Sequence, residues 1–318
     1  MSEERSCCSF FPFLRAPSSN VAIIEGSHKY SYHSLSRRID LVAISLLNGK
    51  SDLNEERIAT YIPASMDYVC TLHGVWRAGG IALPLNTASA VLELEYYLTS
   101  AGATRIITIE KYVELLRTLC DSLNIEVIVA SSLGLSAEVD IEGQRGEIFP
   151  DIAYDRRLMI LFTSGTTNKP KGVVTTRRNI EAQIKSLVEA WEWTSDDVIP
   201  LFLPMHHIHG IINILSCALW AGASVHMYPS FDMPAILDQV ASNTFTVFMA
   251  VPTVYVKIIQ YLESTSSPSD QNSDEDRSAR RAAICEGFQS MRLNVSGSAS
   301  CPMSLFQKWN LLTQQVQT

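Results

Sequence analysis

Short apolar runs alternate with segments whose apolar residues recur every three or four positions along most of this chain. In the first half, the runs predict a hairpin at residues 21–32 and strands at 57–63, 81–85, 104–109 and 126–130. The periodic segments between them predict helices at 34–47, 66–77, 93–101 and 113–123. This alternation favours parallel strand pairing with helices on both sheet faces. The pattern therefore predicts an α/β fold of layered parallel and mixed sheets.

The second half continues the alternation of strands and helices. It predicts strands at 158–162, 172–176, 198–203, 224–228, 246–251 and within 291–296, and helices after an N-cap at Thr176, at 211–220 and at 233–243. Pro200 predicts an edge position or a bulge for its strand, because proline cannot donate to the ladder. The polar connection at 131–155 predicts two subdomains, at 1–155 and 156–318. Residues 263–281 have the composition of a solvated insertion.

The composition excludes several classes of function. The 318 residues are 47% hydrophobic, enough for one large or two ordinary domains, and a net charge of −8 argues against nucleic-acid binding. Seven cysteines without a C-x-x-C pair favour a reducing compartment and no zinc site. The longest apolar passage, 208–225, is interrupted by polar residues and does not predict a membrane span. Residues 1–20 form no clear targeting signal, so an intracellular location in the cytoplasm or the mitochondrial matrix stays open.

A loop rich in hydroxyls and lysines joins the predicted strands 158–162 and 172–176. It carries Thr163, Ser164, Gly165, Thr166, Thr167, Lys169 and Lys171. Backbone amides in a tight turn and nearby ammonium groups suit a polyphosphate. The loop is not a Walker-type P-loop, because Gly172 follows Lys171 instead of preceding it. An ordinary surface hairpin rich in turn residues is the alternative.

The string TSGTTNKPKG at 163–172 resembles the phosphate loop of the adenylate-forming (AMP-binding) superfamily, [ST]SGTTGxPKG. Asn168 stands where glycine is usual, and asparagine tolerates positive φ better than most residues. The upstream strings WRAGGIALPLN and LELEYYLTSAGA also resemble that family. The resemblance implies the family's large N-terminal domain, incomplete at its C-terminal end. It also implies that ATP is bound by Thr163, Ser164, Gly165, Thr166, Thr167 and Lys171.

Three histidines cluster in LPMHHIHG, at His206, His207 and His209. No carboxylate or cysteine lies among them to complete a ligand set, so a metal site is not expected. The string resembles the family motif LPxxHxxG, which implies that His207 lines the pocket for the acyl carboxylate, with His206 beside it. His209 is interpreted as a packing residue. His73, on the apolar stripe of the helix at 66–77, is interpreted as a core histidine.

The string MRLNVSGSASCP at 291–302 resembles the family turn SG[GSA]A-x-x-P. The resemblance implies that Ser296, Gly297 and Ser298 lie against the adenine and the acyl group. Together with LPMHHIHG and FMAVPTVY, the string resembles the malonyl-CoA synthetases, in which the arginine at the position of Arg292 binds the distal carboxylate of malonate. A guanidinium suits a dicarboxylate because it forms a bidentate pair, whereas a fatty-acid pocket would leave it buried and unpaired.

The resemblance implies ATP-dependent activation of a short dicarboxylic acid, malonate, to an acyl-adenylate and then an acyl-CoA. ATP, Mg²⁺ and CoA are the implied cofactors, and a small carboxylic acid and CoA the partners. The family's Mg²⁺-binding glutamate, ribose-binding aspartate and C-terminal domain with the catalytic lysine have no counterpart in these 318 residues. We therefore assign no catalytic residue and expect little or no synthetase activity from this polypeptide alone.

Two alternatives stay open. The first is a CoA ligase for another short- or medium-chain acid, in which Arg292 forms a structural pair. The second is a non-catalytic nucleotide-binding fragment. The sequence does not distinguish a short isoform from an incomplete or decayed sequence, and it leaves the oligomeric state open.

Overall fold

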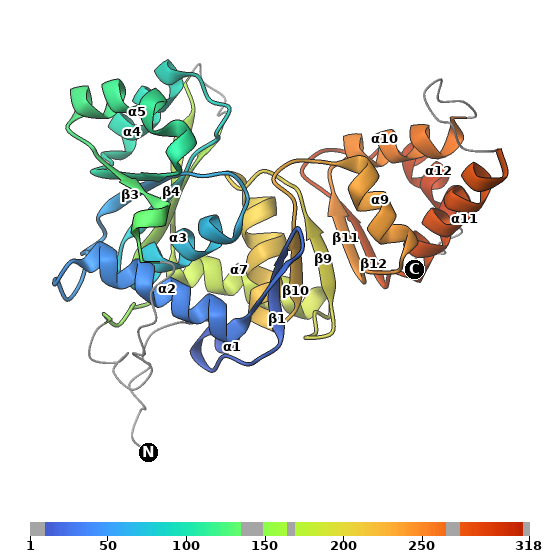
Figure 1. Cartoon of the computed structure of the whole chain (residues 1–318), viewed down its shortest axis with the longest axis horizontal. Helices are drawn as coiled ribbons and strands as arrows, with labels where there is room; N and C mark the ends of the chain where they lie inside the picture. Colours follow the sequence, from blue (N-terminus) through green and yellow to red (C-terminus); the bar gives the residue numbers. More distant parts are fainter. Residues whose placement is uncertain (1–9, 135–148, 164–168, 265–273, 314–318) are drawn as a thin grey trace.

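The computed structural model describes residues 10–134, 149–163, 169–264 and 274–313 of the chain. The strands of these residues form three sheets (Figure 1). The first has the order β6-β5-β3-β4-β7-β8 and contains β3 (Arg57–Tyr61), β4 (Ile81–Pro84), β5 (Arg105–Thr108), β6 (Glu126–Val129), β7 (Arg157–Thr163) and β8 (Lys171–Thr176). Neighbouring strands are parallel except β7 and β8, which form an antiparallel hairpin.

The other two sheets are smaller. The order β2-β1-β10-β9 joins β1 (Val21–Glu25), β2 (His28–Ser31), β9 (Val198–Leu201) and β10 (Ser224–Met227), and a parallel pair joins β11 (Val247–Ala250) to β12 (Leu293–Ser296). Pro200 lies in β9 at the edge of its sheet, as predicted, where its missing N–H breaks no ladder on the free side. The mixed α/β fold of the prediction is confirmed.

Helices cover both faces of the first sheet (Figure 1). The helices are α1 (Pro12–Arg15), α2 (Tyr32–Leu47), α3 (Met66–Arg77), α4 (Val91–Ala101), α5 (Glu110–Leu123), α7 (Arg177–Ala190), α8 (Cys217–Ala221), α9 (Met233–Ala241), α10 (Pro252–Glu263), α11 (Asp274–Ser290) and α12 (Met303–Thr313), with a 3₁₀ turn η1 (Ala130–Ser132) and a π-helix η3 (His209–Ser216). Ala59 and Tyr61 of β3 join the core under α4 and α5, whereas Ile58 joins the core shared with α2 and α3. This alternation follows the two-residue period of a strand.

Two segments differ from the sequence prediction. Residues 274–290 form α11, which docks through the buried Ile284 and Phe288, so the predicted solvated insertion at 263–281 is wrong over its helical part. The helix predicted at 211–220 is divided into η3 and α8. In η3 the Ser216 hydroxyl donates to the Ile211 carbonyl over 2.7 Å, a bond five residues back along the chain that suits a π-helix.

Strands from either side of residue 155 share two of the sheets. Ala82 of β4 pairs with Met159 of β7, and Ile23 of β1 pairs with Val225 of β10. The sheets therefore do not follow the predicted subdomain division at 155/156. Figure 1 instead shows β11, β12 and α9 to α12 grouped at the end of the molecule furthest from α4 and α5.

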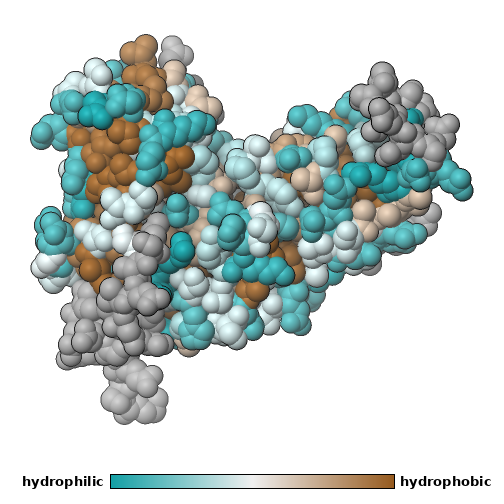
Figure 2. Space-filling model, in the orientation of Figure 1, coloured by the Kyte–Doolittle hydropathy of each residue, from teal (hydrophilic) through white to brown (hydrophobic). Residues whose placement is uncertain are grey.

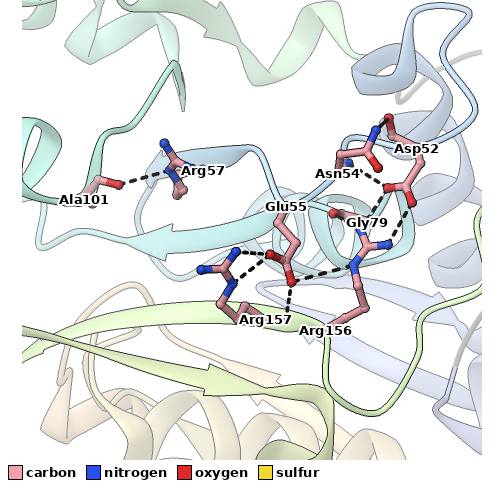
Figure 3. A network of polar contacts seen from close by, with 8 residues as sticks. All are labelled: Asp52, Asn54, Glu55, Arg57, Gly79, Ala101, Arg156 and Arg157. Carbon is pink, nitrogen blue, oxygen red and sulfur yellow. Dashed lines mark hydrogen bonds and ion pairs between the residues drawn. The ribbon is translucent and has the colours of Figure 1, made fainter.

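An arginine pair fixes the start of β7 to the neighbouring loops (Figure 3). Arg156 donates from both terminal nitrogens to the Asp52 carboxylate, over 2.8 and 2.9 Å, and from one of them to the Gly79 carbonyl over 2.7 Å. Arg157 pairs with Glu55, with its Nε 2.7 Å from Oε2. Gly79 has φ +82° and a side chain there would collide with Asp52 Oδ1. The network anchors the amino end of β7, opposite the end at Thr163.

Apolar side chains reach the surface at the end of the molecule that carries α4 and α5 (Figure 2). Leu92 is 78% exposed, and Val91 and Leu115 are also exposed. Within the described residues, no helix combines the length and apolar character needed to cross a membrane.

Candidate active site

A cavity of about 510 Å³ opens at the carboxyl ends of five strands that come from all three sheets. Its walls are formed by residues that come after these strands in the sequence: after β3 (Ile62, Pro63, Ala64), β4 (Leu85, Asn86, Thr87), β9 (Phe202, Leu203, Pro204, Met205, His206), β10 (Pro229, Ser230, Phe231) and β11 (Val251, Val254). Ligands of open α/β sheets bind at this edge, because the loops after parallel strands meet there. Since β4 and β7 are parallel neighbours, Thr163 at the end of β7 belongs to the same edge.

The phosphate hairpin leaves this edge between β7 and β8. Thr163 and Lys171 are paired across the hairpin and both are exposed. A Cβ on Gly172 would lie 3.1 Å from Ile160 Cγ2, so glycine keeps the hairpin closely packed at its base. The predicted contacts Ser164, Gly165, Thr166 and Thr167 lie outside the described residues, and ATP binding by the six predicted residues stays a prediction.

The histidine turn after β9 is held from two sides. The buried Tyr68 of α3 donates its hydroxyl to the Met205 carbonyl over 2.5 Å. A Cβ on Gly210 would lie 2.7 Å from the Pro204 carbonyl oxygen, which explains glycine at the end of LPMHHIHG. The half-buried His206 lines the cavity, while His207 is exposed. The predicted role of His207 is untested, and His206 is the neighbour that faces the hollow.

His209 joins the histidine turn to the Ser-Gly-Ser turn. Its ring is buried at 4% exposure, and its Nδ1 lies 2.8 Å from the Ser298 hydroxyl oxygen. A Cβ on Gly297 would lie 3.1 Å from His209 Cε1, so the glycine lets the ring lie against the turn. Sequence reasoning assigned His209 to packing and missed this contact, because 89 residues separate the partners.

The Ser-Gly-Ser turn is fixed by its strand and by α10. The Gly297 amide donates to the Ala250 carbonyl over 3.1 Å, and the Tyr255 hydroxyl donates to the Val295 carbonyl over 2.8 Å. Ser298 has φ +65°, in the left-handed region that few non-glycine residues adopt. Backbone contacts thus set the positions of Ser296, Gly297 and Ser298 at the carboxyl end of β12.

Arg292 lies at the other end of β12, bound to a buried carboxylate. Its Nε donates to Asp197 Oδ1 over 2.7 Å, its Nη2 to Asp197 Oδ2 over 2.5 Å and its Nη1 to the Trp191 carbonyl over 2.7 Å. Burial alone would raise the pKa of Asp197, but hydrogen bonds from Arg292, the Thr194 amide and Thr246 hold it below its usual range. Five residue steps, about 16 Å at 3.3 Å each, separate Arg292 from Gly297 along the extended chain. The structure therefore does not bring Arg292 together with the Ser-Gly-Ser turn.

The histidines near the cavity are neutral at physiological pH. Burial, with a smaller contribution from His207, lowers the pKa of His206 to about 4. Burial also lowers the pKa of His209. The neutral His206 ring, which lines the cavity, can therefore hold a carboxylate through an N–H group but not as an imidazolium cation. His73, in the core against Phe11 and Trp76 as predicted, has its pKa lowered to about 3 by burial.

A second, open hollow of about 700 Å³ shares Ser230 and Phe231 with the cavity and carries a lysine. Lys257 Nζ lies 6.0 Å from the centroid of the Phe231 ring. The string FMAVPTVY, on which the sequence analysis relied, ends at Tyr255, two residues before Lys257. The helical spacing could have revealed the lysine, because it follows the cavity residue Val254 by three positions and so shares its face of α10.

A sequence profile described as "AMP-binding enzyme" matches residues 13–318. The chain belongs to this family. The resemblance to AMP-binding enzymes inferred from the sequence motifs is thereby confirmed.

Several AMP-binding relatives carry names that specify a substrate. "Malonate--CoA ligase ACSF3, mitochondrial" from Homo sapiens is 33% identical over an alignment of 307 positions, which covers 92% of this chain and 50% of that protein. The Bos taurus protein of the same name is 32% identical over an alignment of 319 positions, which covers 97% of this chain and 53% of the relative. Crystal structures of MatB from Rhodopseudomonas palustris, apo and with ATP bound, superpose with TM-scores of 0.78 and 0.77 at 27% identity.

The chain spans about half the length of the curated relatives it matches. The apo MatB match covers 96% of this chain and 57% of MatB. Family membership and the fold therefore rest on nearly the whole chain. Among the described residues, no three His, Cys, Asp or Glu side chains gather in a way that could hold a metal ion.

Proposed function

We propose that this chain forms the nucleotide- and acid-binding part of an ATP-dependent acid–CoA ligase whose acid is malonate. In such a reaction a carboxylate attacks the ATP α-phosphate, giving an acyl-adenylate and pyrophosphate, and the CoA thiol then displaces AMP. Two anions meet in the first step, so groups that offset charge contribute most to its rate. Mg²⁺, when bound, supplies part of that positive charge.

The observation that carries this proposal is that two motifs from different sheets approach one cavity. The phosphate hairpin leaves β7 beside the loop after β4, and that loop lines the 510 Å³ cavity with the histidine turn. We propose that the triphosphate lies on the hairpin, against Thr163, Ser164, Gly165, Thr166, Thr167 and Lys171. The acid then lies between the histidine turn, with His206 and His207, and the Ser-Gly-Ser turn at Ser296, Gly297 and Ser298.

The choice of malonate rests on the names of the relatives and needs a cation for the second carboxylate. Arg292, the residue expected from sequence, is committed to Asp197 and the Trp191 carbonyl. Lys257 lines the hollow that adjoins the cavity. We therefore propose Lys257 as the partner of the distal carboxylate. If neither cation contacts the acid, a ligase for another short- or medium-chain acid is favoured.

Equilibrium binding to the purified chain tests the proposal. Calorimetry with MgATP, and then with malonate, acetate and octanoate beside a non-hydrolysable ATP analogue, measures nucleotide binding and the order of the acids. We expect MgATP to bind and malonate to bind more tightly than acetate or octanoate. A correctly folded chain that binds no nucleotide would contradict the proposed function.

Three single substitutions locate the cation. Lys257→Met is expected to weaken malonate binding about tenfold or more and leave acetate unchanged, because a charge-assisted pair contributes about 1.5–3 kcal/mol. Lys308→Met is the matched control, because Lys308 pairs with Glu263 on α10. Arg292→Met is expected to change malonate and acetate binding equally. A loss confined to malonate in Arg292→Met would restore the role predicted from sequence.

We also propose a mitochondrial location rather than a cytoplasmic one. The support is that the human and bovine relatives are named as mitochondrial. Fractionation of cells that express the protein from its native gene tests this. Recovery in the cytosolic fraction would contradict it.

A further inference from the structure

One side chain of α4 contacts both sides of the phosphate hairpin. The Tyr96 hydroxyl donates to the carbonyl of Pro170 over 2.8 Å, immediately before β8. Its ring makes an edge contact with Phe162 of β7, with 6.1 Å between centroids. The ammonium of Lys169 lies over the same ring, 5.4 Å from its centroid. A single tyrosine thus contacts the strand that enters the loop and the residues that leave it.

The position of Tyr96 is set by the way α4 docks. Leu94 and Leu98 are fully buried against the first sheet, and they hold the helix in place. Tyr97 adds a second ring on Phe162, with centroids 4.6 Å apart. Because α4 is fixed by its own core contacts, the Tyr96 hydroxyl can act as a fixed point for the hairpin.

The contact is specific to the backbone of the hairpin. Pro170 has no N–H to donate to the β7–β8 ladder, and its contact with Tyr96 runs through its carbonyl, which accepts from the hydroxyl. Lys169 is one of the two loop lysines that suit a polyphosphate. Tyr96 therefore acts on the loop through Pro170 and Lys169 and does not itself need to touch the nucleotide.

We propose that Tyr96 is a positioning residue for nucleotide binding, which fixes the outgoing side of the phosphate hairpin through the Pro170 carbonyl. This inference rests on the proposed function. Removing the hydroxyl frees the Lys169–Lys171 side of the loop, so the bound conformation has to be selected from more alternatives and affinity falls accordingly. The acid site, formed by other segments, keeps its affinity.

Tyr96→Phe tests the hydroxyl alone, because it retains the ring under Lys169 and against Phe162. We expect MgATP affinity to fall about fivefold, as for one lost hydrogen bond, and malonate affinity to stay unchanged. Tyr96→Leu removes the ring as well and is expected to lower the affinity for MgATP further. Tyr112→Phe is the matched control, because Tyr112 lies on α5 and makes an edge contact with Tyr61 instead. It should leave both affinities unchanged.

Hydrogen exchange without nucleotide provides a readout that does not depend on binding. In Tyr96→Phe, amides of the Lys171–Thr176 strand should exchange several-fold faster, and those of α4 at the wild-type rate, which excludes general unfolding. Unchanged MgATP affinity in Tyr96→Phe, or equal weakening of MgATP and malonate, would overturn the positioning role. If the wild-type chain binds no MgATP while exchange still accelerates, the proposed function fails and the anchoring contact alone stands.

Discussion

His209 Nδ1 lies 2.8 Å from the Ser298 hydroxyl oxygen, although 89 residues separate the two in the sequence. The contact joins the turn after β9 to the turn after β12. It closes one side of the region where the acid is proposed to bind. Gly297 permits it, since a side chain there would press on the histidine ring.

Ser298→Ala should destabilise the protein by about 1 kcal/mol, because it removes the hydrogen bond to a buried imidazole. Ser298→Gly removes the same bond but suits φ +65° better, since a left-handed conformation costs other residues about 1–2 kcal/mol. Urea denaturation should therefore rank Ser298→Gly above Ser298→Ala. Equal stability of the two variants would show that the backbone conformation carries no cost.

Arg292→Met should destabilise the chain by about 2–4 kcal/mol, because it leaves the Asp197 carboxylate buried without its partner. Denaturation midpoints measure the loss. The double substitution Arg292→Met with Asp197→Asn should recover part of it, since the uncompensated charge is then removed. A single variant as stable as the wild type would contradict a structural pair and favour a substrate contact.

Stability should fall as the pH is lowered below about 6.5, in part through His73. The pKa of His73 in the folded protein, about 3, lies below its ordinary value of 6.5. Between these two pH values the unfolded chain therefore binds more protons than the folded protein does. Between pH 7.5 and 5.5 this residue alone should cost about 1.4 kcal/mol. His73→Leu should remove that part of the slope. His28→Gln, at an exposed position, is the control that should retain it.

Gly210→Ala should disturb the histidine turn, because the new Cβ would lie 2.7 Å from the Pro204 carbonyl oxygen. We expect a loss of about 1–3 kcal/mol and weaker malonate binding as His206 moves. Gly26→Ala is a matched control with positive φ and open space around it, so it should lose only about 1 kcal/mol. Similar losses and unchanged malonate binding in both variants would argue against the close approach.

Strand and helix positions could be predicted where the hydrophobic repeat extended over many residues and capping or turn residues marked its ends. The helix Met66–Arg77 and the Thr176 N-cap are as predicted, because a run of core positions and a capping hydroxyl act within a few residues. The helix at 274–290 was not predicted, because its polar composition resembles a solvated loop. Its two docking residues, Ile284 and Phe288, acquire meaning only against the rest of the core.

The sequence by itself determined the phosphate hairpin, the histidine turn and the Ser-Gly-Ser turn, and through them the family. Each of the three is a contiguous string whose backbone shape depends on its own glycines, prolines and hydroxyls. Only the tertiary structure decided which side chains meet. Asp197, 95 residues before Arg292, pairs with the guanidinium that the motif at 291–302 suggested for binding a substrate. Likewise, Ser298 lies against His209, and Tyr96 of α4 against Pro170. Such partners depend on strand order and on how helices dock, and no local pattern encodes either.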